Sequence, residues 1–177
     1  MKTFLTALLL TALGISGVRA AGPPAMPLHD TPRPVPEVAF ADGEGEPLTL
    51  DTWRGKIVLL NIWATWCGPC REEMPTLDRL QARLGGDHFE VVALSIDRAG
   101  VRVVAKFFKE IRIEHLRTFI DDSGKAARDL KVFGLPATLL IGRDGRELGR
   151  LVGPAEWDTP EMIALLKTVI ANQQERN

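Results

Sequence analysis

The stretch that decides the fold is Trp63-Ala64-Thr65-Trp66-Cys67-Gly68-Pro69-Cys70, which holds the only two cysteines of the 177-residue chain. The apolar run at 56–62 comes directly before it and is typical of a buried strand. The residues that follow it, 71–74, favour a helix. The two cysteines therefore lie where a strand ends and a helix begins.

A cysteine at this junction is well placed for redox chemistry. The first turn of a helix has unpaired backbone N–H groups and the positive end of the helix dipole, and such a setting lowers the pKa of a thiol below its usual value of about 8.5. The thiolate is the form that attacks a disulfide. We therefore predict dithiol–disulfide exchange, with Cys67 as the exposed attacking sulfur and Cys70, one turn inside the helix, as the more buried resolving thiol.

Longer stretches resemble a known family. Trp-Cys-Gly-Pro-Cys resembles the active site of thioredoxin, and residues 61–75 resemble more narrowly the TlpA/ResA/CcmG group of exported thioredoxin-like reductants, TlpA above all. The likeness covers nearly all of the chain after residue 36 and includes 153–157, a TlpA-like stretch for which the sequence indicates no role. It implies an α/β, thioredoxin-like fold: a central mixed β-sheet flanked by helices, with an extra helix–strand insertion between 96 and 136, before the cis-Pro loop.

The resemblance also implies a carboxylate in the site. Glu73 lies three residues after Cys70 and so shares its helix face, and the family has at this position a glutamate that lies beside the redox pair and takes part in proton transfer. Glu72 is rotated by about 100° and should meet solvent. The alternative is that Glu73 is an ordinary solvated glutamate. The buried aspartate of thioredoxin falls at Asn61, which cannot titrate, and this leaves Glu73 as the only nearby acid.

Substrate-binding residues are expected around the cysteines. Residues 133–138, Phe-Gly-Leu-Pro-Ala-Thr, resemble the family's cis-proline loop, which implies a cis bond before Pro136 and backbone groups of Leu135 that bond to a bound client. The Gly-Pro pair between the cysteines accompanies reducing function in the family. The expected substrate-binding residues are Trp66, Gly68, Pro69, Leu135 and Pro136, whereas Trp63 could be plain core.

The chain begins with the features of an export signal. Lys2 is followed by sixteen uncharged residues, and Val18-Arg19-Ala20 supplies small residues at the −3 and −1 positions of a cleavage site. We predict a signal peptide over 1–20. An uncleaved membrane anchor is the alternative, although the run is shorter than the about 20 apolar residues that span a bilayer.

Residues 21–36 carry six prolines, a density that excludes helix and central strand and predicts an extended linker. The thioredoxin-like domain is therefore expected at 37–177, where strands and helices alternate. Two hairpins are expected, around Asp42-Gly43 and around Asp144-Gly145. The expected strands lie at 38–40, 48–50, 57–63, 89–96, 118–120, 137–141 and 147–152, and the expected helices at 68–84, around 104–111, at 125–130 and from 158 or 159 onward.

These observations predict an exported thiol–disulfide oxidoreductase that reduces protein disulfides in the periplasm, or on the exported side of the cytoplasmic membrane if the anchor is kept. It is expected to need no cofactor beyond its redox-active disulfide. The resemblance implies client proteins with cysteine pairs, either apocytochrome c or copper-site proteins of respiratory oxidases, and a membrane thiol transporter of the DsbD/CcdA type as electron donor. A formal net charge of −1 gives no argument for nucleic acid as a partner.

Other classes fit the sequence less well. A structural disulfide would stabilise little, because a CxxC pair closes a very short loop. Structural zinc takes four ligands, whereas the chain has one cysteine pair and three scattered histidines, His29, His88 and His115, each expected on the surface. Copper-handling proteins of the Sco type use CxxxC rather than CxxC. Thiol peroxidases on the same fold need a PxxxTxxC setting, which the chain lacks.

Overall fold

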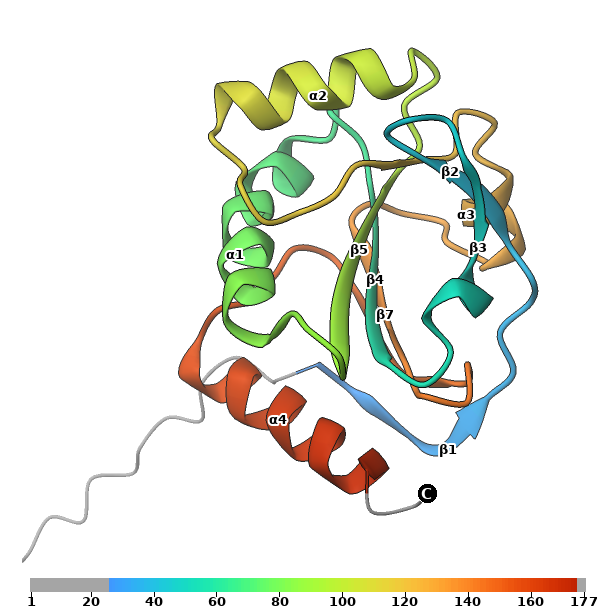
Figure 1. The fold of residues 1–177 in the computed structure, drawn as a ribbon, viewed down its shortest axis with the longest axis vertical. Helices are drawn as coiled ribbons and strands as arrows, with labels where there is room; N and C mark the ends of the chain where they lie inside the picture. Colours follow the sequence, from blue (N-terminus) through green and yellow to red (C-terminus); the bar gives the residue numbers. More distant parts are fainter. Residues whose placement is uncertain (1–25, 175–177) are drawn as a thin grey trace, which may run out of the picture.

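The computed structural model describes residues 26–174 and shows one sheet with helices on both faces (Figure 1). The sheet has eight strands in the order β1-β8-β7-β4-β5-β6-β2-β3. Strand β4 (Ile57–Trp63) lies inside it, parallel to β5 and antiparallel to β7. The mixed α/β sheet agrees with the predicted thioredoxin-like class. The predicted signal peptide at 1–20 and the first part of the predicted linker, 21–25, lie outside the described residues.

The elements predicted from residue 38 onward are found close to their expected positions. The segment predicted as an insertion contains the helix α2 and the strand β6. The other strands are β1 (Leu28–Arg33), β2 (Ala39–Asp42), β3 (Pro47–Thr49), β5 (Phe89–Ser95), β6 (Phe119–Ile120), β7 (Ala137–Ile141) and β8 (Glu147–Val152). The helices are α1 (Gly68–Leu84), α2 (Val101–Glu110), α3 (Lys125–Asp129) and α4 (Pro160–Gln174), with a 3-10 turn at Leu50–Trp53.

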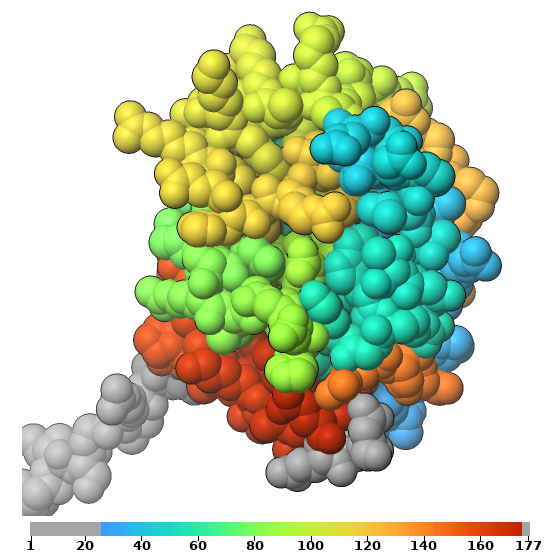
Figure 2. All heavy atoms as spheres, in the orientation of Figure 1, coloured from blue at the N-terminus to red at the C-terminus, as the bar shows by residue number. Residues whose placement is uncertain are grey.

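The core has two parts because successive side chains of a strand point to opposite faces of a sheet. All seven residues of β4 are buried. Leu59 and Trp63 belong to a cluster that α1, α2 and α4 cover, whereas Leu60 and Ile62 belong to a second cluster that α3 covers. Figure 2 shows α2, α1 and α4 following one another along one face of the molecule. The covered faces explain why the apolar run of β4 is continuous rather than alternating.

The linker prediction is wrong for residues 28–33, which form β1 at one edge of the sheet, and the core already includes Met26. An edge strand bonds on one side only, so a proline there need not donate a hydrogen bond. The proline within β1 is Pro32. Pro27, directly before the strand, likewise supplies only its carbonyl, which accepts the Arg150 N–H at 3.2 Å. The folded domain therefore begins before the predicted residue 37.

A buried carboxylate fastens β1 to β8. Glu147 accepts hydrogen bonds from Arg150 Nε at 2.9 Å, from Arg150 Nη2 at 2.8 Å and from His29 Nε2 at 2.9 Å. The expectation that His29 lies on the surface is wrong, because β1 brings its side chain against Glu147 and leaves it 13% exposed. Burial alone would raise the pKa of Glu147, but the bonds from Arg150 and His29 outweigh burial and hold this pKa below its ordinary value.

Glu147→Ala is expected to lower the free energy of unfolding by about 2 kcal/mol, because it leaves the guanidinium of Arg150 without its anion. Asp51→Ala removes the carboxylate of the exposed Arg54–Asp51 pair and should cost at most about 1 kcal/mol. Since the folded-state pKa of Glu147 is lowered, its stabilisation is present above the unfolded-state pKa and is lost as pH falls through the folded-state pKa. Urea unfolding at neutral and acidic pH measures both effects. Equal losses in the two variants would contradict this account of β1.

Candidate active site

Cys67 and Cys70 form a disulfide at the start of α1, with their Sγ atoms 2.03 Å apart. Cys67 is the N-cap residue of the helix, and its Sγ accepts the Cys70 N–H at 3.3 Å. Pro69 is tolerated in the first turn, because the N–H that it lacks has no partner inside the helix. The positive end of the helix dipole favours negative charge on Cys67. No acidic residue in the first turn opposes this effect.

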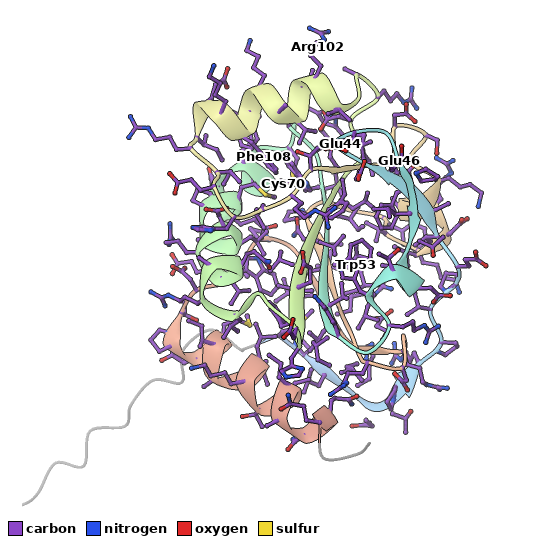
Figure 3. The ribbon with its side chains drawn as sticks, viewed as in Figure 1. Glu44, Glu46, Trp53, Cys70, Arg102 and Phe108 are labelled. Carbon is purple, nitrogen blue, oxygen red and sulfur yellow. A yellow bond between two sulfur atoms is a disulfide. The ribbon has the colours of Figure 1, made fainter. Side chains whose placement is uncertain are left out.

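The two cysteines differ in exposure in the expected order, but by little. Cys70 is fully buried and Cys67 is 7% exposed. The expectation of an exposed Cys67 is wrong for this disulfide form, because the bond ties its side chain to that of the buried Cys70. Figure 3 shows Cys70 below α2, where it shares a core cluster with Phe108. Gly68 and Pro69 are exposed beside the disulfide, and Trp66 is exposed over 68% of its surface.

Trp63 is core, the first of the two tryptophans around the cysteine turn. Its indole is fully buried and stacks on the ring of Phe108, with the ring centres 5.5 Å apart. Trp66, three residues later, points to solvent instead. The chain therefore leaves the core within the turn that precedes Cys67.

Strand register brings the predicted cis-proline loop to the end of β4. Ala137 pairs with Ile62, so Pro136 lies beside the point where the chain leaves β4 for the cysteine turn. The Leu135–Pro136 bond is cis, as the resemblance implied. The carbonyl of Pro136 accepts the Gly153 N–H at 2.9 Å, which ties this loop to the end of β8.

Glu73 lies in a pocket of hydrogen-bond donors and is 2% exposed. Asn61 Nδ2 donates to its Oε1 at 2.7 Å, and the Ala155 N–H and Trp157 Nε1 donate to its Oε2 at 3.1 and 3.0 Å. Burial raises the pKa of Glu73 above its ordinary value, although these donors oppose the rise. The alternative of a solvated Glu73 is therefore wrong, whereas Glu72 is exposed as predicted.

Asn61 extends this polar cluster across the sheet. Its Nδ2 also donates to Thr138 Oγ1 at 3.0 Å, which links β4 to β7 inside the core. Its Oδ1 is buried and has no hydrogen-bond partner among the described residues. The cluster around Glu73 therefore contains one hydrogen-bond acceptor, Asn61 Oδ1, that the described residues leave without a donor.

The stretch at 153–157 has a role that the sequence did not indicate. It joins β8 to α4 and completes the pocket around Glu73. Besides the two bonds to Glu73, the backbone N–H of Trp157 donates to Thr76 Oγ1 at 3.1 Å, and the Trp157 side chain is fully buried. Only the resemblance drew attention to this stretch, since no local pattern shows that its donors meet a carboxylate on α1.

Trp157→Phe is expected to raise the pKa of Glu73 further, because the ionised carboxylate loses the indole donor while the pocket stays apolar. The rise reflects the loss of one hydrogen bond to the ionised form. A titration of the Glu73 carboxyl carbon by NMR measures it. Trp53→Phe is the control, since Trp53 lies in the other core cluster. A pKa of Glu73 that stays at the wild-type value in Trp157→Phe would show that the indole does not stabilise the ionised form.

Comparison with known proteins agrees with this geometry. A model of the AhpC/TSA family matches residues 32–146. The chain belongs to this family. It is 32% identical over 118 residues to the thiol-disulfide oxidoreductase ResA of Bacillus thuringiensis, a match that covers 67% of each chain. It is 37% identical over 102 residues to the thiol:disulfide interchange protein CycY of Rhizobium leguminosarum, which covers 58% of this chain and 53% of CycY.

A solved structure extends the agreement to the fold. The crystal structure of a putative thiol:disulfide interchange protein DsbE from Chlorobium tepidum superimposes with a TM-score of 0.66 at 30% identity, and the match covers 81% of this chain and 97% of that one. The predicted thioredoxin-like fold and the ResA/CcmG group are confirmed. The chain is a thiol:disulfide oxidoreductase with the CxxC pair Cys67–Cys70. Its special likeness to TlpA stays a prediction.

Residues 26–174 contain neither a cluster of metal-ligating side chains nor a membrane-spanning helix. Nowhere in this part of the chain do three or more His, Cys, Asp or Glu side chains gather as metal ligands. No helix within it is long and apolar enough to cross a membrane.

Proposed function

We propose that the protein is an exported reductant of protein disulfides in which Cys67 attacks, Cys70 resolves and Glu73 moves protons. The observation that carries the proposal is the position of the only cysteine pair at the N-terminus of α1, one turn before a buried glutamate. The helix terminus favours the thiolate that exchange requires.

Exchange then takes two steps. In the dithiol form, the Cys67 thiolate attacks one sulfur of a client disulfide, which forms a mixed disulfide and releases the other client sulfur as a thiolate. The Cys70 thiolate next attacks the Cys67 sulfur, which forms the Cys67–Cys70 bond and releases the second client sulfur. The client gains two electrons and two protons, and the protein loses both.

Glu73 is suited to the proton transfers because its pKa is raised toward neutral pH, where a general acid or base works best. Cys70 must lose its proton before it attacks, and Glu73 lies three residues later on the same face of α1. The unpartnered Asn61 Oδ1 supports this role. A rotation of the Asn61 amide would offer an acceptor to protonated Glu73 in place of the donor that its ionised form receives.

Client binding is assigned to the surface around the disulfide, made of Trp66, Gly68, Pro69, Leu135 and Pro136. Phe133 extends this set, because it lies three residues before Pro136 and its side chain is 94% exposed. Exposed aromatic rings such as those of Trp66 and Phe133 are suited to contact an apolar client segment. No sequence pattern singles out Phe133, because an aromatic residue in a loop can equally well be buried in the core.

The clients we propose are apocytochrome c, with its CxxCH haem site, or copper-site proteins of respiratory oxidases. The likeness of 153–157 to TlpA favours the copper branch. A membrane thiol transporter of the DsbD/CcdA type would return electrons to Cys67–Cys70. The signal-peptide pattern at 1–20 supports export, either to the periplasm or as an anchored protein on the outer side of the cytoplasmic membrane.

A comparison of peptide clients tests the direction and the client class. The dithiol protein is mixed with oxidised peptides that carry a CxxCH haem site, a copper-site cysteine pair or an unrelated disulfide of equal length, and kcat/KM is measured for each. We expect one of the two biogenesis peptides to be reduced faster than the unrelated peptide by about tenfold or more. Equal rates for all three would remove the support for a dedicated client. Oxidation of reduced peptides by the disulfide form, with no reaction in the other direction, would overturn the assignment as a reductant.

A further inference from the structure

Asp97 is a buried carboxylate that the exchange reaction does not use. It lies two residues after the end of β5 and is 4% exposed. Its Oδ2 accepts the Thr65 N–H at 2.8 Å and the Ser95 hydroxyl at 2.7 Å, and its Oδ1 accepts the Thr65 hydroxyl at 2.7 Å. Burial of a carboxylate is costly unless it is hydrogen-bonded in this way, so the arrangement holds Thr65 in a defined place.

Sheet register explains why these two residues meet. β4 and β5 are parallel, and Trp63 pairs with Ser95 at their carboxyl ends. Both strands end on the same side of the sheet, so the residues two positions further along, Thr65 and Asp97, face each other. Thr65 is in turn two residues before Cys67, whose N–H donates to the Ala64 carbonyl at 3.1 Å. Through its hydrogen bonds to Thr65, Asp97 therefore restrains the turn that carries the attacking sulfur.

The same turn is held from α1. The carbonyl of Thr65 accepts Arg71 Nη1 at 3.2 Å. The guanidinium of Arg71 lies over the ring of Phe107 on α2, 4.4 Å from the ring centre, in a favourable cation–π contact. The N–H, hydroxyl and carbonyl of Thr65 are thus all bonded. Within residues 26–174, no other residue of the turn between β4 and Cys67 has this many hydrogen-bonded polar groups.

The disulfide form and the dithiol form depend to different degrees on the hydrogen bonds between Asp97 and Thr65. In the disulfide form the S–S bond itself ties Cys67 to Cys70 and so restrains the turn. Reduction breaks that bond and adds two electrons and two protons, after which the contacts of Thr65 supply more of the restraint on the chain before Cys67. We propose that Asp97 is a positioning residue for disulfide exchange, which through Thr65 holds the Cys67 turn in place in the dithiol form.

Loss of the hydrogen bonds between Asp97 and Thr65 should destabilise the dithiol form more than the disulfide form, because the S–S bond still restrains the turn in the disulfide form. The equilibrium in which the protein disulfide and two glutathione thiols give the protein dithiol and oxidised glutathione should then shift toward the protein disulfide. The consequence concerns exchange itself and does not depend on which client the protein reduces.

The test uses Thr65→Val, which removes the hydroxyl, nearly keeps the side-chain shape and changes no charge. In a glutathione redox buffer, the equilibrium constant for forming the protein dithiol is expected to fall by about fivefold, the equivalent of one hydrogen bond. Thr65→Ser keeps the hydroxyl and should restore the wild-type value. Urea unfolding should show a larger loss for Thr65→Val in the dithiol form than in the disulfide form.

Ser123→Ala is the matched control. Ser123 donates its hydroxyl to another buried carboxylate, Asp121, at 2.5 Å in the loop between β6 and α3. This variant should lose similar stability in both redox forms and keep the wild-type glutathione equilibrium. If Thr65→Val behaves like Ser123→Ala, Asp97 has only a structural role and the proposal is wrong.

Hydrogen exchange on the wild-type protein gives a test that needs no variant. The Thr65 amide, which donates to Asp97, is expected to keep its protection when the disulfide is reduced. Loss of that protection on reduction would overturn the proposal, because the hydrogen bond between Thr65 and Asp97 would then be absent from the dithiol form.

Discussion

Cys67→Ser is expected to reduce the rate of client reduction to that of the reaction without protein. The chain has no cysteine besides Cys67 and Cys70, and the buried Cys70 cannot reach a client sulfur from inside α1. Serine is close in shape but is a far weaker nucleophile at neutral pH. The measurement is the release of client thiols over time, with circular dichroism to show that the variant is folded.

Cys70→Ser has a different expected outcome that fixes the order of the two steps. Attack by Cys67 is retained, but nothing resolves the product, so about one client peptide per protein should remain attached as a mixed disulfide. Mass spectrometry of the quenched mixture measures the adduct. Repeated turnover by Cys70→Ser without any adduct would show that the roles of the two cysteines are wrongly assigned.

Glu73→Gln is expected to slow client reduction by about a hundredfold, the usual contribution of general acid–base catalysis. The ionised carboxylate also disfavours a second negative charge on a nearby sulfur, so its removal should lower the apparent pKa of the thiols. Glutamine should fit the pocket, since the unpartnered Asn61 Oδ1 can accept from its amide after a rotation of Asn61. The measurements are thiolate absorbance and alkylation rate against pH, together with the reduction rate.

Glu72→Gln is the control for this prediction, because it makes the same chemical change at the neighbouring exposed position. It should leave both the rate and the thiol titration as in wild type. The folded-state pKa of Glu73 is raised, so its contribution to stability is full below the unfolded-state pKa and is lost as pH rises through the folded-state pKa. Glu73→Gln should therefore lack this decline of stability with pH. Identical behaviour of the two variants in all these measurements would exclude a role for Glu73 in exchange.

Local signals were sufficient for the elements that carry the cysteines. The apolar run before the CxxC pair predicts a buried strand, and β4 has the predicted bounds Ile57–Trp63. The pair Gly85-Gly86 after α1 marks its end at Leu84. The helix spacing from Cys70 correctly places Glu73 on an inward face and Glu72 in solvent. These features depend on residues within one or two turns of each other.

Features that depend on distant parts of the chain were not predictable in this way. β1 was missed because the prolines in and around it indicate a linker, and only its position at a sheet edge makes Pro32 acceptable within the strand. The pocket around Glu73 needs Trp157, which is 84 positions away in the chain. The contact of Asp97 with Thr65 follows from the parallel register of β4 and β5. A sequence pattern predicts that strands exist more readily than it predicts which residues their pairing brings together.

We propose that the Cys67–Cys70 dithiol passes two electrons to a client disulfide, and a thiol count on both partners measures this transfer. The dithiol protein is mixed with an equal amount of oxidised client peptide, the reaction is quenched with acid, free thiols are alkylated, and both chains are weighed by mass spectrometry. We expect that each peptide that gains two alkyl groups is matched by one protein that gains none and contains the Cys67–Cys70 disulfide. Peptide reduction without loss of the protein dithiol, or a protein that stays fully alkylated beside an oxidised peptide, would contradict it.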